Sequence, residues 1–297
     1  LVSLPVRETA VRREIVALID NDPSRTFHVT ATQAPLVRAL VQTAPLPAFG
    51  WAAISNDTND ANDTDSTGGL HDGAAPHNPV EIRAEHRRVT LTNGLVDVEI
   101  HPDGTFTLDG VGPHGAVVES GDAGDTYNYS PPPQDREVRD PRSVRVDVVE
   151  RGPLRTRVHI VRDFVWPTHE HDRARAGEGE VSVTSTLEIR ADEPFVRLEV
   201  SWNNAGFRDH RVRVEFATGT TPLGSSAECV FAVVDRGLDA EGGPHERALA
   251  TYPSRRFVSA GSTLVSHDRV TEYEVLAESR VLAVTAVRGT AWLSRAD

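Results

Sequence analysis

Strict alternation of apolar and polar residues is the feature that most constrains what this chain can fold into. It runs through Arg155–Trp166, 181–190 and 195–202. Because successive side chains of a strand point to opposite faces, this period of two predicts strands with one face on a core and one in water. Asp192-Glu193-Pro194 separates two of the segments and predicts a hairpin turn.

The remaining alternating segments extend the prediction along most of the chain. They are 89–100 with an interruption at Asn93-Gly94, 144–149, 212–216, 273–276 and 281–287. We therefore predict an all-β fold, with a small β-sandwich unit over 1–55 and a large antiparallel β-sandwich over 83–297. Residues 11–19 also fit a helical period, but their β-branched content and the turn that follows favour a strand.

Residues 56–82 separate the two predicted units. From Asn56 to Pro79 the chain offers almost no side chain that could be buried. Such a composition cannot offset the entropy of ordering, and it predicts a flexible linker or mobile loop.

The composition of the chain limits which partners it is expected to bind and which cellular compartment it is expected to occupy. The 297 residues carry a formal net charge of -13, which argues against nucleic acid and against an anionic membrane surface. Cys229 is the only cysteine, so no intrachain disulfide can form and a cytoplasmic protein is favoured. Cys229 lies in the strand-like segment 228–233 and is expected to be a buried, inert thiol. No stretch of about 18 apolar residues occurs that would predict a membrane span.

The loop-like segment 121–132 concentrates side chains suited to recognition. It reads Gly-Asp-Ala-Gly-Asp-Thr-Tyr-Asn-Tyr-Ser-Pro-Pro and lies between alternating segments. Sugar sites combine flat rings with fixed hydrogen-bonding groups, and loops on a rigid scaffold usually supply them. An Asp/Gly turn whose tyrosines only stabilise the fold is the alternative.

Two further clusters have ligand-type chemistry. His169-Glu170-His171-Asp172 could chelate a divalent metal, because alternate residues of a strand point the same way, but a charged hairpin tip is favoured. Asp209-His210-Arg211 could bind a sugar or a carboxylate, and a structural role through buried charge-assisted hydrogen bonds is favoured.

Four segments together resemble the C-terminal β region of glycoside hydrolase family 38 α-mannosidases. The segment 121–132 is similar to the family's "GD-x-Y-[ND]-[YF]-S-P" stretch, and 91–105 is similar to its "L-x-N-x-L-V-x-V-x-[IV]-x-x-DGT" stretch. Trp202-Asn203-Asn204 with 209–214 resembles "W-x-N-x…DHR-[LV]-R-V", and 44–51 resembles "V-P-x-[LF]-G-[YW]". The resemblance implies a mutarotase-like supersandwich for the large domain.

The resemblance also implies a function for the parent protein. Family members hydrolyse α-mannosides with retention, using a divalent metal, usually zinc, and an Asp nucleophile in an N-terminal α/β domain. Nothing in this chain resembles that metal-binding region, so we assign no catalytic residue, no metal ligand and no cofactor here. The implied partners are an α-mannoside or oligosaccharide and the protein's own N-terminal catalytic domain, and a homo-oligomer is also compatible.

The resemblance implies one sugar-contacting site in this chain. The family's loop tyrosine reaches the sugar site, and it corresponds here to Tyr127, with Asp125 and Asn128 beside it. Two other classes stay open: a stand-alone carbohydrate-binding module, and another carbohydrate-active enzyme whose acid/base pair would include His210 and a nearby carboxylate.

Overall fold

The computed structural model describes residues 8–24, 40, 75–85, 88–240, 242–243, 248–268 and 272–294. The chain divides into two compact units, Leu1–Thr43 and Ala44–Asp297. Among the described residues, no helix is long and apolar enough to cross a membrane.

The element described in the first unit is a helix, α1 (Glu8–Asn21), so the prediction of a strand over 11–19 is wrong. Ala, Arg, Glu and Leu, which favour helices, outnumber the β-branched residues in this segment. The expected turn is present and follows the helix, where Asp22 accepts hydrogen bonds from the Ser24 amide and hydroxyl. The rest of the small β-sandwich unit predicted over 1–55 falls almost wholly outside the described residues, as does the motif at 44–51.

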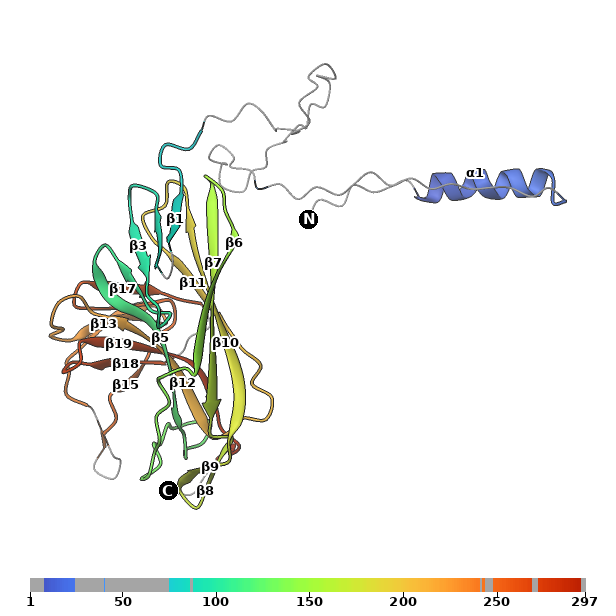
Figure 1. Ribbon diagram of the computed structural model, residues 1–297. Helices are drawn as coiled ribbons and strands as arrows, with labels where there is room; N and C mark the ends of the chain where they lie inside the picture. The colour runs from blue at the N-terminus through green and yellow to red at the C-terminus, as the bar shows by residue number, and fades with distance from the viewer. Residues whose placement is uncertain are drawn as a thin grey trace. The chain divides into compact units, whose positions relative to one another are not determined.

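The second unit contains a nine-stranded sheet in the order β1-β2-β3-β4-β5-β12-β19-β18-β15 (Figure 1). Its strands are β1 (Glu81–Glu85), β2 (Arg88–Thr92), β3 (Asp97–Ile100), β4 (Phe106–Leu108), β5 (Val111–Gly121), β12 (His210–Ala217), β15 (Thr251–Pro253), β18 (Glu272–Leu276) and β19 (Val281–Gly289). The neighbouring strands pair antiparallel.

Two four-stranded antiparallel sheets and one hairpin complete the unit. The first sheet has the order β11-β10-β7-β6, with β6 (Ser143–Glu150), β7 (Arg155–Trp166), β10 (Gly179–Arg190) and β11 (Arg197–Ser201). The second has the order β14-β13-β16-β17, with β13 (Ser225–Cys229), β14 (Ala232–Arg236), β16 (Phe257–Ala260) and β17 (Thr263–Ser266). The hairpin joins β8 (His169–His171) to β9 (Ala174–Ala176).

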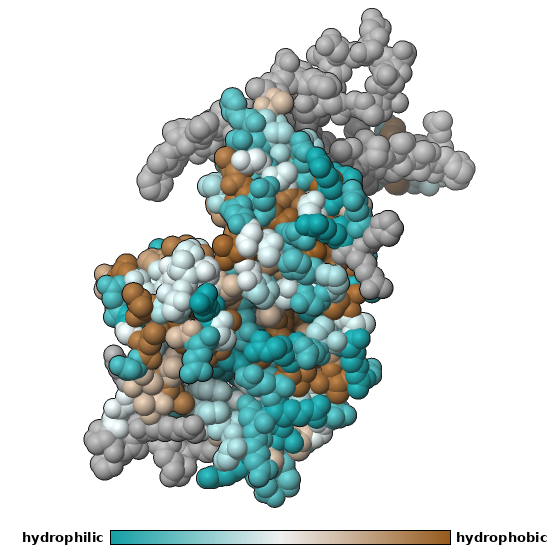
Figure 2. Space-filling view, turned by 60° about the vertical axis from the view of Figure 1, so that its left-hand side comes forward, coloured by the Kyte–Doolittle hydropathy of each residue, from teal (hydrophilic) through white to brown (hydrophobic). Residues whose placement is uncertain are grey.

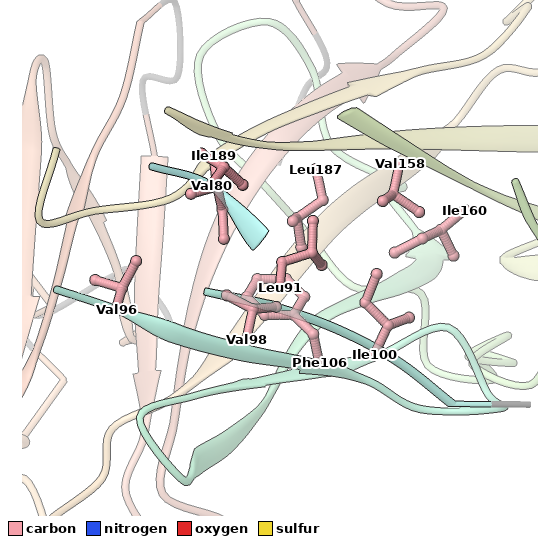
Figure 3. Close-up of a cluster of buried hydrophobic side chains, with 10 residues drawn as sticks. All are labelled: Val80, Leu91, Val96, Val98, Ile100, Phe106, Val158, Ile160, Leu187 and Ile189. Atoms are coloured by element: carbon pink, nitrogen blue, oxygen red, sulfur yellow. The ribbon is translucent and has the colours of Figure 1, made fainter. Parts of the chain in front are cut away.

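Apolar faces of these sheets form the core. One cluster joins β2, β3 and β4 to β7 and β10, with Leu91, Ile100 and Phe106 facing Val158 and Leu187 (Figure 3). A second joins β12, β18 and β19 to the sheet of β13 and β16, and a third joins β5 and β12 to β7 and β10. The nine-stranded sheet therefore packs against both smaller sheets, and the prediction of an all-β sandwich is confirmed.

Most alternating segments form the predicted strands, and the hairpin turn at Asp192-Glu193-Pro194 joins β10 to β11 as expected. Two predictions need correction. Asn93-Gly94 is a hairpin turn between β2 and β3, because the Asn93 amide oxygen accepts the Leu95 and Val96 amides and Gly94 has a φ of 76°. The segment 228–233 likewise turns at Phe231, and Cys229 is half-buried rather than buried.

The predicted boundary at residue 83 lies inside the sandwich. Val80 belongs to the core, and β1 begins at Glu81. Asn78 donates backbone and side-chain hydrogen bonds of 2.8 Å and 3.0 Å to the Asp192 carboxylate. The last residues of the predicted linker are therefore held by the sandwich, and the linker prediction for 56–74 concerns residues outside the described part.

Candidate functional site

The connection from β5 to β6 contains the predicted recognition loop, and its shape is fixed by two aspartates. The buried Asp122 carboxylate accepts hydrogen bonds from the amides of Gly124 and Ser130. Asp125 accepts the Tyr127 and Asn128 amides at 2.8 Å and 3.0 Å, and its own amide donates to the Asn128 carbonyl. Asp125 and Asn128 therefore shape the turn, which is the role that Asp residues commonly have in such loops.

Glycine is required at position 124. A Cβ atom there would lie 2.0 Å from the Asn128 carbonyl oxygen, which no side chain can do without moving the backbone. The Gly-Asp-Ala-Gly-Asp motif is therefore explained by local packing.

Arg288, near the end of β19, and the residues that follow this strand also hold the recognition loop. Arg288 donates to the Asp122 carboxylate at 2.7 Å and to the Asp125 carbonyl at 2.8 Å. The Thr290 hydroxyl donates to the Gly124 carbonyl, and the Thr126 hydroxyl donates to the Leu293 carbonyl at 2.6 Å. Arg288 and Thr290 could not be identified from the sequence, because they lie more than 160 residues from their partners and in no motif.

The two tyrosines of the loop differ in environment. Tyr127 is 75% exposed, and no hydrogen bond of its hydroxyl is found among the described residues. Tyr129 is half-buried, with its ring 4.5 Å from the Arg211 guanidinium carbon. Burial raises the pKa of the Tyr129 hydroxyl. The loop thus presents Tyr127 outward and is anchored through Tyr129.

A buried charged layer next to Tyr129 lies along one face of β12 and consists of Arg211, Arg213, Glu215 and Glu274, and the half-exposed Glu137 and Arg139 pair with it. Alternation along β12 sends Val212 and Val214 into apolar clusters and Arg211 and Arg213 to this opposite face. Arg211 lies 2.8 Å from the Glu272 carboxylate and 3.2 Å from that of Glu274. Arg213 bonds to Glu274 and Glu137, and Arg139 bonds to Glu215 at 2.5 Å. Arg211 therefore has the structural role that the sequence favoured for the cluster Asp209-His210-Arg211.

His210 forms a second buried group with Glu119 and Arg175. The His210 Nδ1 atom lies 3.4 Å from the Glu119 carboxylate, and Arg175 pairs with the same carboxylate. Trp166 and Phe207 cover the imidazole, and both His210 and Glu119 are 0% exposed. A general acid or base must come within hydrogen-bonding distance of its substrate. This buried pair does not meet that requirement, which argues against the alternative of an acid/base site at His210.

The cluster His169-Glu170-His171-Asp172 forms the tip of the β8–β9 hairpin, as favoured from the sequence. Thr168 shares a 2.9 Å hydrogen bond with His169, and His171 lies 3.4 Å from the carboxylate of Asp172. Within the described residues, no group of three or more His, Cys, Asp or Glu is arranged to hold a metal ion. These residues therefore do not fit the zinc site of the implied parent.

Comparison with known proteins supports the resemblance at the level of the fold. No protein-family model and no curated protein sequence matches the chain. An α-mannosidase from Enterococcus faecalis V583 shares the fold with a TM-score of 0.64 at 20% identity, over 72% of this chain and 27% of that protein. A glycosyl hydrolase family 38 protein from Enterococcus faecalis matches with a TM-score of 0.64 at 19% identity, over 73% of this chain and 28% of that one.

The chain therefore has the all-β sandwich fold found in part of these glycoside hydrolases, and it spans about a quarter of their length.

Proposed function

We propose that this chain is the non-catalytic C-terminal β portion of an α-mannosidase-like glycoside hydrolase of family 38. In this proposal it supports the active site and contacts the sugar through Tyr127, with Asp125 and Asn128 shaping the loop. The N-terminal α/β domain of the parent supplies zinc and the nucleophile for hydrolysis of α-mannosides with retention. A cytoplasmic location, as the single cysteine suggests, belongs to the same proposal.

The observation that carries the proposal is that the Tyr127 side chain is exposed while the backbone around it is held in place. An exposed tyrosine ring on a surface loop is usually free to move, but here the backbone on both sides is fixed by Asp125 and by Arg288. A fixed loop loses little entropy on binding, and a phenol can cover an apolar sugar face while its hydroxyl bonds a sugar hydroxyl. The shared fold and the ordered series of motif segments support the family assignment.

The isolated 297-residue chain provides the test. We expect methyl α-mannoside to bind weakly, as measured by saturation-transfer NMR, and we expect Tyr127→Ala to weaken binding by roughly threefold or more. Phe231→Ala is the matched control, since Phe231 is 99% exposed at the unrelated β13–β14 turn. Binding that is indifferent to Tyr127, or zinc-dependent hydrolysis of an aryl α-mannoside by this chain alone, would contradict the proposal.

A further inference from the structure

A cavity of about 500 Å³ lies beside the recognition loop, at the end of the sandwich where the β8–β9 hairpin is attached. Its walls are the hairpin turn at 170–173, Arg208 and Asp209 before β12, and Ala291 and Trp292 after β19. On the face shown in Figure 2, hydrophilic residues predominate at the lower end, where Figure 1 places β8 and β9. This volume is in the usual range for small-molecule sites.

Hydrogen bonds between the walls give the cavity a defined shape. The Asp209 carboxylate, 7% exposed, accepts the Ala291 amide at 3.0 Å and lies 3.4 Å from the Arg208 guanidinium. The Arg208 amide donates to the Thr168 carbonyl, and the Asp122 amide donates to the Asp209 carbonyl, both at 3.0 Å. A buried carboxylate thus joins the strand entry at β12 to the segment that carries Trp292.

The lining chemistry selects the ligand class. Trp292 is 49% exposed and offers an aromatic surface, while Arg, Asp, Glu and His side chains surround it. The lining has two arginines against three carboxylates, so it carries no excess of positive charge that would select an anion. Among the described residues, no group of His, Cys, Asp or Glu side chains here is arranged to hold a metal ion. An aromatic ring with planar hydrogen-bonding side chains suits a neutral sugar.

We infer that this cavity is a second sugar subsite, which takes a neutral hexose unit of a longer glycan. The inference rests on the proposed function, and it makes the substrate class an oligosaccharide. The two subsites are physically connected, because Trp292 is followed by Leu293, whose carbonyl accepts the hydrogen bond from Thr126 beside Tyr127. One glycan could therefore contact both Tyr127 and Trp292.

The indole N–H signals of the 297-residue chain test the inference. The chain has four tryptophans, so the Trp292 signal can be assigned from its loss in Trp292→Ala. We expect an α-linked mannobiose to shift this signal and not that of Trp166, which is 0% exposed. Trp292→Ala should weaken mannobiose binding about tenfold, as truncation of a central aromatic contact does, and Arg208→Ala should weaken it as well. Phe231→Ala is the control and should bind normally.

Other results separate this inference from the proposed function. Mannobiose binding that depends on Tyr127 and is unaffected by Trp292→Ala would overturn the second subsite and leave the proposed function intact. Binding of maltose in place of mannobiose, lost in Trp292→Ala, would support a sugar subsite and count against the mannosidase assignment. Failure of both disaccharides to bind the folded chain, or preference for a uronic acid disaccharide, would overturn the subsite.

Discussion

At the scale of single residues, environment separates side chains that look alike in the sequence. Tyr127 and Tyr129 are two positions apart, yet one is exposed and the other packs against Arg211. Asn93 lies in the stretch 91–105 that resembles a family motif, and its amide donates to the carbonyls of Arg190 and Glu193 at 2.8 Å. Residues of the family-like motifs therefore often stabilise turns in this protein. A functional role requires a side chain that is both exposed and held in a fixed position.

Glu274 is expected to contribute more to stability than an exposed glutamate. Glu274 is 8% exposed, and its carboxylate is shared by Arg211 and Arg213. Glu274→Gln should lower the free energy of unfolding by about 1–3 kcal/mol, because buried donors lose a charged acceptor. Glu99→Gln, which affects a surface pair with Arg88, should cost below about 1 kcal/mol. Equal losses in urea titrations of the two variants would contradict the assignment of a buried layer.

His114 predicts how stability depends on pH. Burial lowers the pKa of this imidazole, which is 4% exposed and packs against Phe106 and Phe216. A lowered folded-state pKa gives stability that is present above the unfolded pKa of about 6.5 and is lost as the pH falls through the folded pKa. Burial lowers the pKa of His267 too, so both contribute.

The unfolding free energy should therefore fall as the pH is lowered below about 6.5, the unfolded-state pKa of histidine. His114→Gln should reduce this slope without abolishing it, since His267 remains. His171→Gln, which removes an exposed imidazole, is the matched control. A slope that is unchanged in His114→Gln would rule out the buried imidazole as a cause.

At the scale of elements, period-two alternation located the strands that have one apolar and one polar face. In β7 and β10, buried and less buried positions alternate over much of the strand, so the side chains alternate between apolar and polar as well. β5 was missed because Gly112, Pro113 and Gly115 break its pattern. β8, β9 and β15–β17 show no clear alternation because they are only three or four residues long, and β13 and β14 each overlap the single strand-like segment predicted over 228–233.

The candidate site was predictable only in part. A local motif located the loop and its Asp turns. Arg288 and the walls of the cavity come from distant strand ends that meet only after the sheet forms, so no spacing in the sequence could indicate them.

The recognition loop should depend on Asp125 more than the whole fold does. Asp125→Ala removes the acceptor of the Tyr127 and Asn128 amides. We expect faster amide hydrogen exchange at 126–130 and weaker binding of methyl α-mannoside, with a melting temperature within a few degrees of the wild type because Asp122 and Arg288 still anchor the loop. Phe231→Ala, at the unrelated β13–β14 turn, is the control. Exchange that stays as slow as in the wild type would show that Asp125 does not shape the loop.

At the scale of the whole molecule, the sandwich should be stable without the residues that precede it. Its core begins at Val80, and the composition of 56–74 offers little to bury. A chain of residues 75–297 should therefore unfold cooperatively, with a melting temperature within a few degrees of that of the full chain. A broad, non-cooperative transition in differential scanning calorimetry would show that the earlier residues belong to the same folding unit.

Under the proposed function, this β sandwich supplies a sugar-contacting tyrosine to an α-mannosidase. The most direct measurement is kcat/KM for an α-mannoside in the longer enzyme that the proposal implies, with and without Tyr127→Phe. Loss of one neutral hydrogen bond, about 0.5–1.5 kcal/mol, should lower kcat/KM roughly threefold to tenfold while the melting temperature stays the same. An unchanged kcat/KM together with a lower melting temperature would contradict the claim, because Tyr127 would then be a structural residue.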